Sequence, residues 1–251
     1  MPYVSQDGVR IHYQTEGSGP PLVLHHWTFS SLEWWYNLGY VNALQDSAKL
    51  ILIDARAHGM SGKPEKPGDY SLEVRVRDVC AVLDALGIGR THFFGYSMGG
   101  WIGYGMAIHA ADRLCSLVLG GAHPYEQSMQ GTRGFLSIGL EQGPSAFADA
   151  WEAQVGPLTG DQRNRMLAFD YAAMIQAAGD RASLEAGLES IRTPCLMFAG
   201  EGDSVLGKLR QASREIAGTS LSIIPSRGHN AIQDVRAVAA LVLSMVSEHR
   251  C

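Results

Sequence analysis

Strand-length apolar runs alternate with helix-length amphipathic stretches toward both ends of this chain. Runs typical of strands occupy residues 9–15, 21–25, 49–53, 91–95, 114–119, 193–199 and 220–224. Helical patterns occupy residues 32–44, 72–86 and 98–109, and Ser71 and Gly87 suit the start and the end of the second helix. Because strands that alternate with helices form parallel sheets with right-handed crossovers, the pattern predicts an α/β fold with a mostly parallel central sheet flanked by helices.

The strand pattern is interrupted between residues 123 and 190. This segment is rich in Ala, and its helix-like stretches lie at residues 147–154, 162–176 and 181–191. We therefore predict a core formed by residues 1–122 and 191–251, with a helical insertion at residues 123–190.

The sequence Gly95-Tyr96-Ser97-Met98-Gly99 joins an expected strand to an expected helix. A serine on such a sharp turn has strained backbone geometry, and side chains at the two glycine positions would collide with neighbouring backbone. The first amides of the following helix point toward the space beside the serine oxygen, where they favour negative charge. The motif therefore predicts a nucleophile at Ser97 and one oxyanion-binding amide at Met98.

A serine nucleophile needs a base and an acid, and two later strands are followed by suitable residues. Asp203 comes shortly after the expected strand 193–199, and His229 follows the strand 220–224. Since the carboxyl ends of parallel strands meet at one edge of a sheet, both side chains are expected beside Ser97. Their order, Ser then Asp then His, is the order that such sheets use. Glu126 is an alternative acid.

Four ordered motifs resemble the α/β-hydrolase superfamily over nearly the whole chain. Besides Ser97 and the Asp and His motifs, residues 22–27 resemble the strand followed by His-Gly-x, and residues 50–61 resemble the D-x-R-G-x-G-x-S turn. The resemblance implies that the Trp27 amide is the second oxyanion donor and that Asp54 fixes the turn. His26 and Ala57 occupy positions where the family usually has glycine.

The resemblance also gives the insertion a role, because the family places a small helical cap at this point of the chain. A cap over the crevice excludes water and shapes an apolar pocket. We expect His26, His123 and Tyr125 to reach this pocket and contact substrate. The resemblance therefore implies an α/β fold class, an α/β-hydrolase fold with a small helical cap.

Composition excludes several other classes of protein. The 251 residues are 46% hydrophobic, enough for one α/β domain with an insertion, and the net charge of −5 without a basic run argues against nucleic acid as a partner. No apolar run approaches the ~20 residues of a membrane span. The four cysteines lack metal-like spacing and are expected to be free thiols, and the N-terminus does not resemble a signal peptide. We expect a cytoplasmic protein; its oligomeric state stays open.

The favoured function is cleavage of a small-molecule carboxylic ester or lactone through an acyl-enzyme on Ser97, without a metal or organic cofactor. The resemblance leaves open carbon-carbon bond hydrolysis in aromatic degradation, cofactor-free perhydrolysis, and a small-molecule receptor that keeps its triad. Haloalkane dehalogenases and epoxide hydrolases are disfavoured, because those relatives carry Asp where Ser97 stands.

Overall fold

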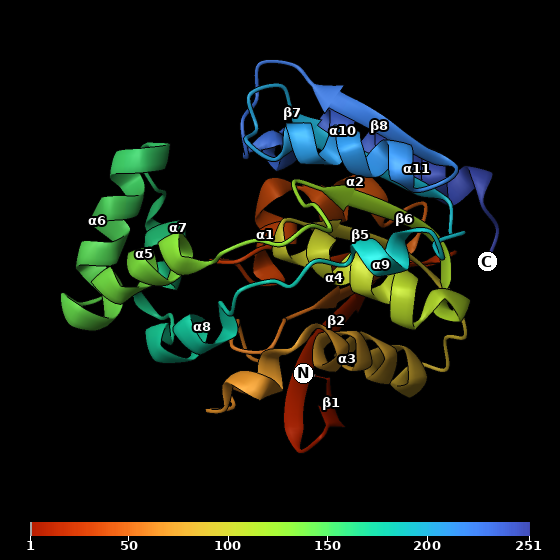
Figure 1. Ribbon diagram of the computed structural model, residues 1–251. Helices are drawn as coiled ribbons and strands as arrows, with labels where there is room; N and C mark the ends of the chain where they lie inside the picture. The colour runs from red at the N-terminus through yellow and green to blue at the C-terminus, as the bar shows by residue number, and fades with distance from the viewer. Residues whose placement is uncertain (1) are drawn as a thin grey trace.

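The computed structural model describes residues 2–251, and within that range the chain forms an eight-stranded sheet covered by helices on both faces (Figure 1). The strand order is β1-β2-β4-β3-β5-β6-β7-β8. β2 is antiparallel to β1 and to β4, and all other neighbours are parallel. The strands are β1 Tyr3–Gln6, β2 Val9–Glu16, β3 Pro21–His25, β4 Lys49–Ile53, β5 Thr91–Tyr96, β6 Leu114–Gly120, β7 Cys195–Gly200 and β8 Thr219–Ile224.

Alternating side chains of the central strands fill two hydrophobic cores. Ile51 of β4 and Phe93 of β5 belong to the core under α3 (Leu72–Ala85), α4 (Met98–His109) and α10 (Leu206–Glu215). Leu52 and Phe94, the next residue in each strand, belong to the core under α1 (Glu33–Leu38), α2 (Tyr40–Leu44) and α11 (Val235–Glu248). Burial on both faces is typical of parallel strands, and it confirms the predicted fold class.

The predicted helix over residues 32–44 is wrong in one respect. Gly39 adopts a left-handed conformation with φ of 92°, so the segment forms α1 and α2. The short 3₁₀ helices are η1 Pro67–Tyr70, η2 Ala111–Arg113 and η3 Ala231–Gln233.

Five helices lie between β6 and β7: α5 Gln130–Glu141, α6 Pro144–Val155, α7 Gly160–Leu167, α8 Tyr171–Ala177 and α9 Glu185–Leu188. Helices α5 to α8 extend to one side of the sheet (Figure 1) and share a cluster that includes Leu136, Phe147 and Met174. The expected helix 162–176 is divided, because Asp170 caps a new helix at α8. In the expected helix 181–191 only α9 is helical, and its Leu188 packs in the core under α3 and α4.

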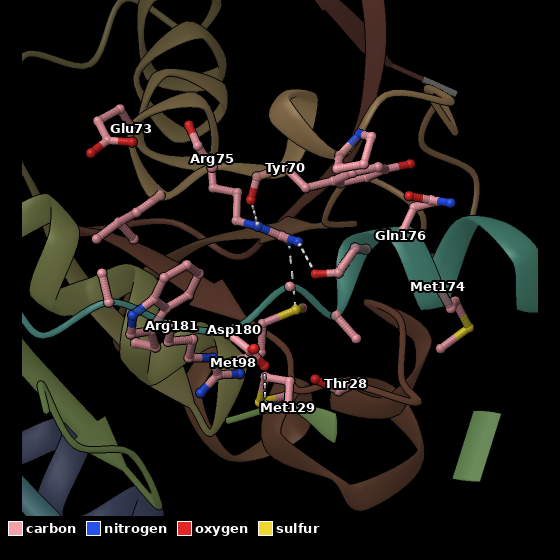
Figure 2. Close-up of a pocket in the computed structure, with 18 of the residues that line it drawn as sticks. Thr28, Tyr70, Glu73, Arg75, Met98, Met129, Met174, Gln176, Asp180 and Arg181 are labelled. Carbon is pink, nitrogen blue, oxygen red and sulfur yellow. Dashed lines mark hydrogen bonds between the residues drawn. The ribbon is translucent and has the colours of Figure 1, made fainter. Parts of the chain in front are cut away.

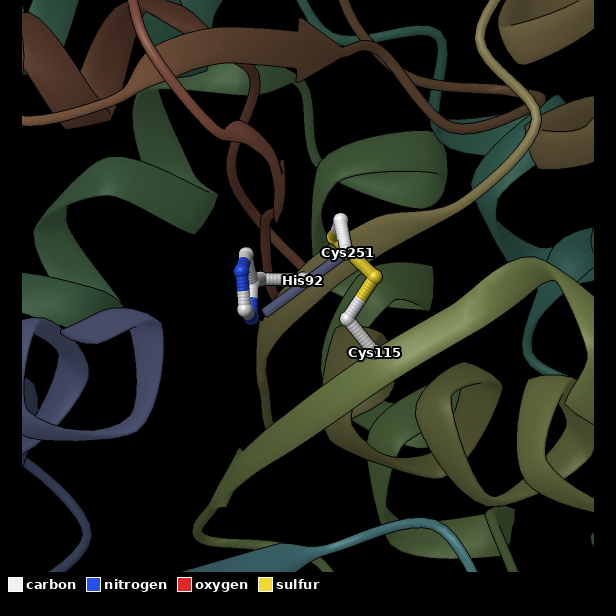
Figure 3. A group of neighbouring side chains, drawn as sticks. All are labelled: His92, Cys115 and Cys251. Atoms are coloured by element: carbon white, nitrogen blue, oxygen red, sulfur yellow. A yellow bond between two sulfur atoms is a disulfide. The ribbon is translucent and has the colours of Figure 1, made fainter. Parts of the chain in front are cut away.

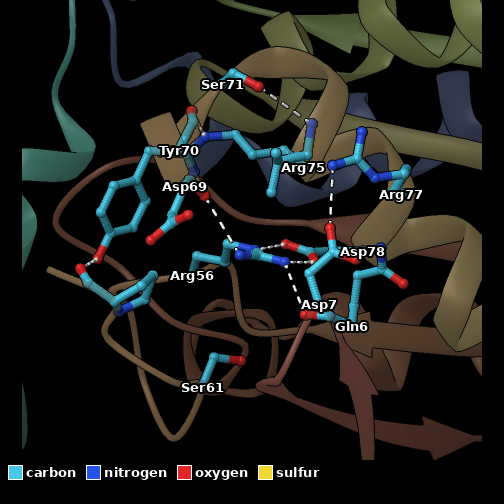
Figure 4. A network of polar contacts seen from close by, with 12 residues as sticks. Gln6, Asp7, Arg56, Ser61, Asp69, Tyr70, Ser71, Arg75, Arg77 and Asp78 are labelled. Atoms are coloured by element: carbon cyan, nitrogen blue, oxygen red, sulfur yellow. Dashed lines mark hydrogen bonds and ion pairs between the residues drawn. The ribbon is translucent and has the colours of Figure 1, made fainter. Parts of the chain in front are cut away.

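The turn after β4 is held by the Asp54 carboxylate, as the sequence predicts. It accepts hydrogen bonds from the amides of Leu32 (2.8 Å) and Met60 (3.0 Å). Ala57 has φ of 69°, a conformation that suits the glycine usual at this position. The Arg56 side chain extends from the turn and donates two hydrogen bonds to the Asp78 carboxylate of α3, at 2.6 and 2.7 Å (Figure 4). This buried ion pair joins the turn to α3.

The prediction of four free thiols is wrong for two of them. Cys115 of β6 and Cys251, which follows α11, form a disulfide with a Cα–Cα distance of 5.1 Å (Figure 3). The two cysteines are 136 residues apart, so only the packing of α11 on the sheet brings them together. His92 lies beside them, but their sulfurs are bonded to each other and are not free to bind metal. Within residues 2–251, Cys80 and Cys195 remain free.

The disulfide removes one ground for the expected cytoplasmic location, because disulfides persist mainly in oxidising compartments. Separately, among the helices of residues 2–251 none combines the length and the apolar character that a membrane crossing requires.

Candidate active site

Ser97 occupies the sharp turn between β5 and α4. Its backbone has φ of 51° and ψ of −108°, and its amide donates to the Gly120 carbonyl of β6 at 2.7 Å. A Cβ atom on Gly95 would overlap the Gly99 backbone, and one on Gly99 would overlap the His25 backbone of β3. Both glycines are therefore required by close backbone contacts, and the strain expected at the serine is present.

His229 and Asp203 form one hydrogen-bonded series with Ser97. His229 Nε2 lies 3.2 Å from Ser97 Oγ, and His229 Nδ1 lies 2.9 Å from Asp203 Oδ2. The Asp203 side chain is fully buried at 0% exposure, whereas that of His229 is 51% exposed. The other Asp203 oxygen, Oδ1, accepts from the Val205 amide at 3.1 Å, which fixes the carboxylate. Asp203, rather than Glu126, is thus the acid that contacts the histidine.

The loops that carry the acid and the base are tied to each other. The Gly202 amide donates to the Arg227 carbonyl at 2.8 Å, and Gly200 lies so close to residues 227 and 228 that a side chain there would collide with their backbone. Tyr96, next to the serine, donates its hydroxyl hydrogen to the His229 carbonyl at 3.0 Å. These contacts set the position of the imidazole relative to the strand ends.

His26 lines neither of the cavities beside Ser97, so the structure does not bring its ring to the site. Its ring is fully buried: Nε2 accepts from the Ala55 amide at 3.0 Å, and Nδ1 donates to the Trp27 carbonyl at 2.8 Å. Burial lowers the pKa of His26, so the ring stays neutral. The side chain at the usual glycine position therefore holds the Trp27 peptide in place. Among the hydrogen bonds of residues 2–251, the Trp27 and Met98 amides donate to no protein acceptor.

His123 and Tyr125 are also turned away from the cavities beside Ser97. The two rings are stacked with centroids 6.0 Å apart, and Tyr125 donates to Glu215 of α10 at 2.7 Å. Both residues are buried, because the chain after β6 packs against α10 before it enters the insertion. Neither His123 nor Tyr125 lines either cavity, so the structure does not bring these two residues to the site.

Two cavities flank the turn at Ser97. The smaller, about 270 Å³, has Thr28, Met98 and Trp101 on its core side (Figure 2); the insertion contributes Met129, Met174 and residues 176–182. The larger, about 490 Å³, is lined by Trp27, Tyr96 and His229 together with residues of the insertion such as Trp151 and Met166. The insertion thus forms a wall of both cavities.

The sequence analysis did not identify two functional candidates, Arg75 of α3 and Arg181 between α8 and α9. Both are buried and line the smaller cavity (Figure 2). In a sequence, an arginine on an amphipathic helix or in a polar loop looks like an exposed residue, so no local signal indicates it.

Comparison with known proteins places this chain in one family. Residues 20–172 match the model of the alpha/beta hydrolase fold. The chain belongs to the α/β-hydrolase fold family. It is 26% identical over 248 residues to a putative 2-succinyl-6-hydroxy-2,4-cyclohexadiene-1-carboxylate synthase of Bacillus subtilis, covering 89% of each chain.

Solved structures agree with this placement. The enol-lactonase from Burkholderia xenovorans LB400 superposes with a TM-score of 0.86 at 25% identity, covering 98% of this chain and all of that one. A hydrolase from Pseudomonas aeruginosa superposes with a TM-score of 0.83 at 26% identity, covering 98% of this chain and 97% of that one. The chain is accordingly a hydrolase of the α/β-hydrolase superfamily.

Proposed function

We propose that this chain hydrolyses a small-molecule carboxylic ester or lactone through an acyl-enzyme on Ser97. The observation that carries the proposal is the continuous series from Ser97 Oγ through the His229 ring to the buried Asp203 carboxylate, at 3.2 and 2.9 Å. Nucleophile, base and orienting acid within hydrogen-bond reach are what acyl transfer requires. The enol-lactonase and the other hydrolase relatives agree with it.

In the first half-reaction, Ser97 Oγ attacks the carbonyl carbon while its proton moves to His229 Nε2. Asp203 accepts a hydrogen bond from His229 Nδ1–H, which keeps Nε2 free as the base and stabilises the charged ring. The Trp27 and Met98 amides are the proposed donors to the tetrahedral oxyanion, and removing one such donor typically costs about 3 kcal/mol.

His229 then gives its proton to the leaving oxygen as the carbon-oxygen bond breaks. In the second half-reaction, His229 takes a proton from water, the resulting hydroxide attacks the acyl carbon, and Ser97 recovers its proton from His229. The products are the acid and the alcohol, or the opened hydroxy acid of a lactone. Because His229 lines the larger cavity, the leaving group belongs there, and the acyl part extends past Met98 into the smaller cavity.

Carbon-carbon bond hydrolysis is the second candidate, because it uses the same three side chains and two buried arginines line the smaller cavity. Perhydrolysis and a receptor role stay as the further alternatives. A cytoplasmic location and a small-molecule substrate, without nucleic acid or membrane as partners, also stay predictions.

The test is hydrolysis of 4-nitrophenyl esters, a lactone panel and a vinylogous diketone panel by wild type and Ser97→Ala. We expect Ser97→Ala to reduce kcat for esters or lactones by at least about 10⁴-fold. Ser116→Ala is the matched control, because Ser116 Oγ also contacts a histidine, His92 at 2.8 Å, but has no strained turn or acid. Turnover that survives in Ser97→Ala, or that occurs only with the diketones, contradicts the proposal.

A further inference from the structure

Two buried arginines face the smaller cavity beside Ser97. Arg75 is 2% exposed and Arg181 is 7% exposed, and both line the space that Met98 and Thr28 border on the core side (Figure 2). Met98 and Thr28 directly follow Ser97 and Trp27 in the chain, so this cavity adjoins the proposed position of the substrate carbonyl. Two guanidinium groups therefore lie near the reacting centre without touching it.

Arg75 has no carboxylate partner among the residues that the structure describes. Its Nε donates to the Tyr70 carbonyl at 3.0 Å, Nη2 donates to the Ala177 carbonyl at 2.9 Å, and Nη1 lies 3.6 Å from Met98 Sδ. The nearby carboxylate of Asp78 is occupied by two hydrogen bonds from Arg56. These contacts hold the guanidinium in place, and none of them is made with a carboxylate.

Arg181 is likewise without an acidic partner in residues 2–251. Its Nη1 donates to the amide oxygen of Gln127 at 3.0 Å, and its guanidinium lies 5.0 Å from the centre of the Trp101 ring. The neighbouring Asp180 accepts from Arg133 at 2.9 Å and from the Met129 amide at 2.6 Å, and it is exposed. Glu73, the other acid of the cavity wall, is exposed as well.

Burying two like charges in one cavity is unfavourable unless an anion joins them. Burial lowers the pKa of Arg75 to about 10 and that of Arg181 to about 9, and the Arg75 charge contributes to the second shift. A guanidinium keeps its charge at neutral pH even so, and its planar N–H groups match a carboxylate. A buried charge is normally paired, so two buried guanidinium groups that face one cavity suit an anionic ligand.

We propose that Arg75 and Arg181 form a subsite for a carboxylate on the acyl part of the substrate. The preferred substrates are then half-esters or lactones that carry a free carboxylate, a substrate class that rests on the proposed ester or lactone hydrolysis. The volume of about 270 Å³ lies near the lower end of small-molecule sites and suits a short acyl chain.

The experiment compares two esters of equal carbon count, 4-nitrophenyl hydrogen glutarate and 4-nitrophenyl valerate, which differ by the terminal carboxylate. We expect kcat/KM of the wild type to favour the glutarate by about 10-fold or more. Arg181→Gln should lower kcat/KM for the glutarate about 10- to 100-fold, because a hydrogen bond to a charged group is typically worth this factor. It should change kcat/KM for the valerate by less than about threefold. Arg181→Lys should restore part of the glutarate activity.

Arg163→Met is the matched control. Arg163 also belongs to the insertion, but it is paired with Asp149 and Glu152 and lies outside both cavities. This variant should leave the ratio of the two esters unchanged. The proposed subsite would be overturned by a wild type whose kcat/KM is higher for valerate than for glutarate. It would also be overturned by an Arg181→Gln variant whose kcat/KM falls equally for both esters, because that result is expected of an arginine with a purely structural role.

A binding measurement separates this proposal from the proposed function. Glutarate is titrated into Ser97→Ala and into Ser97→Ala with Arg181→Gln, followed calorimetrically and by thermal unfolding. Binding that requires Arg181 supports the subsite even if neither ester is hydrolysed, an outcome that would reject only the ester hydrolysis. Absence of glutarate binding in Ser97→Ala rejects the subsite even if valerate is cleaved.

Discussion

Acid should unfold this protein through three buried histidines near the oxyanion loop. His25, His26 and His58 are all fully buried, with ring centroids 5.7 Å apart for the first pair and 5.1 Å for His26 and His58. Burial lowers the pKa of all three, that of His25 to about 3, and neighbouring histidines contribute to the shifts of His25 and His58. The folded state thus holds the three rings neutral where the unfolded chain protonates them.

The direction of the pH dependence follows from the number of protons that the folded and the unfolded chain bind. Between the unfolded pKa of 6.5 and the lowered folded pKa, the unfolded chain binds more protons, so stability falls as pH falls through this window. For one ring that stays neutral, the free energy lost between about pH 7 and about pH 5.5 is about 1.2 kcal/mol. Several such rings together account for a large part of the stability of a typical domain, and His92 and His123, whose pKa values burial lowers to about 4, add to the loss.

The assay is urea unfolding at both pH values and constant ionic strength, followed by tryptophan fluorescence. His58→Asn should reduce the pH-dependent loss by up to about 1.2 kcal/mol, because one buried ring that the folded state keeps neutral is gone. His109→Asn is the control, since His109 is exposed at the end of α4 and should leave the loss unchanged. A loss below about 1 kcal/mol in the wild type, or one that His58→Asn does not reduce, would refute the reasoning.

Two further substitutions test the site and the disulfide. Asp203→Asn should lower kcat for the ester substrate about 10³- to 10⁴-fold with little change in KM, because the carboxylate sets the tautomer and stabilises the charged ring; a loss confined to KM would contradict this role. Cys251→Ser should reduce the free energy of unfolding by about 2 to 5 kcal/mol, since it opens a loop with a sequence separation of 136 residues. Equal unfolding of oxidised and reduced wild type would show that this bond does not form in solution.

Prediction of the site from sequence succeeded where the cause is local. The strained turn at Ser97 depends on Gly95 and Gly99 and on the strand and helix around them, all within a few residues. Asp203 and His229 were predictable because each follows a strand of a parallel sheet, whose carboxyl ends share one edge. The structure brings the three side chains together as that reasoning expects.

The contacts of a side chain were not predictable where its partner lies in a distant segment of the chain. His26 lies in the expected loop, but its ring turns inward to the Ala55 amide. Tyr125 follows the expected strand, but its hydroxyl is bound by Glu215, which is 90 residues away. Residue type and position in a loop do not specify such a partner, because the partner comes from another element of the fold.

The sequence by itself therefore determined the alternation of strands and helices, the serine turn, and the strand ends at which the acid and the base are found. These features depend on side-chain periodicity and on short-range backbone sterics. Only the tertiary structure decided that Cys115 meets Cys251 and that Arg75 and Arg181 face one cavity without a carboxylate partner of their own among residues 2–251. Such contacts join distant segments, and they exist only after the sheet order and the packing of the helices have been set by the burial of the whole core.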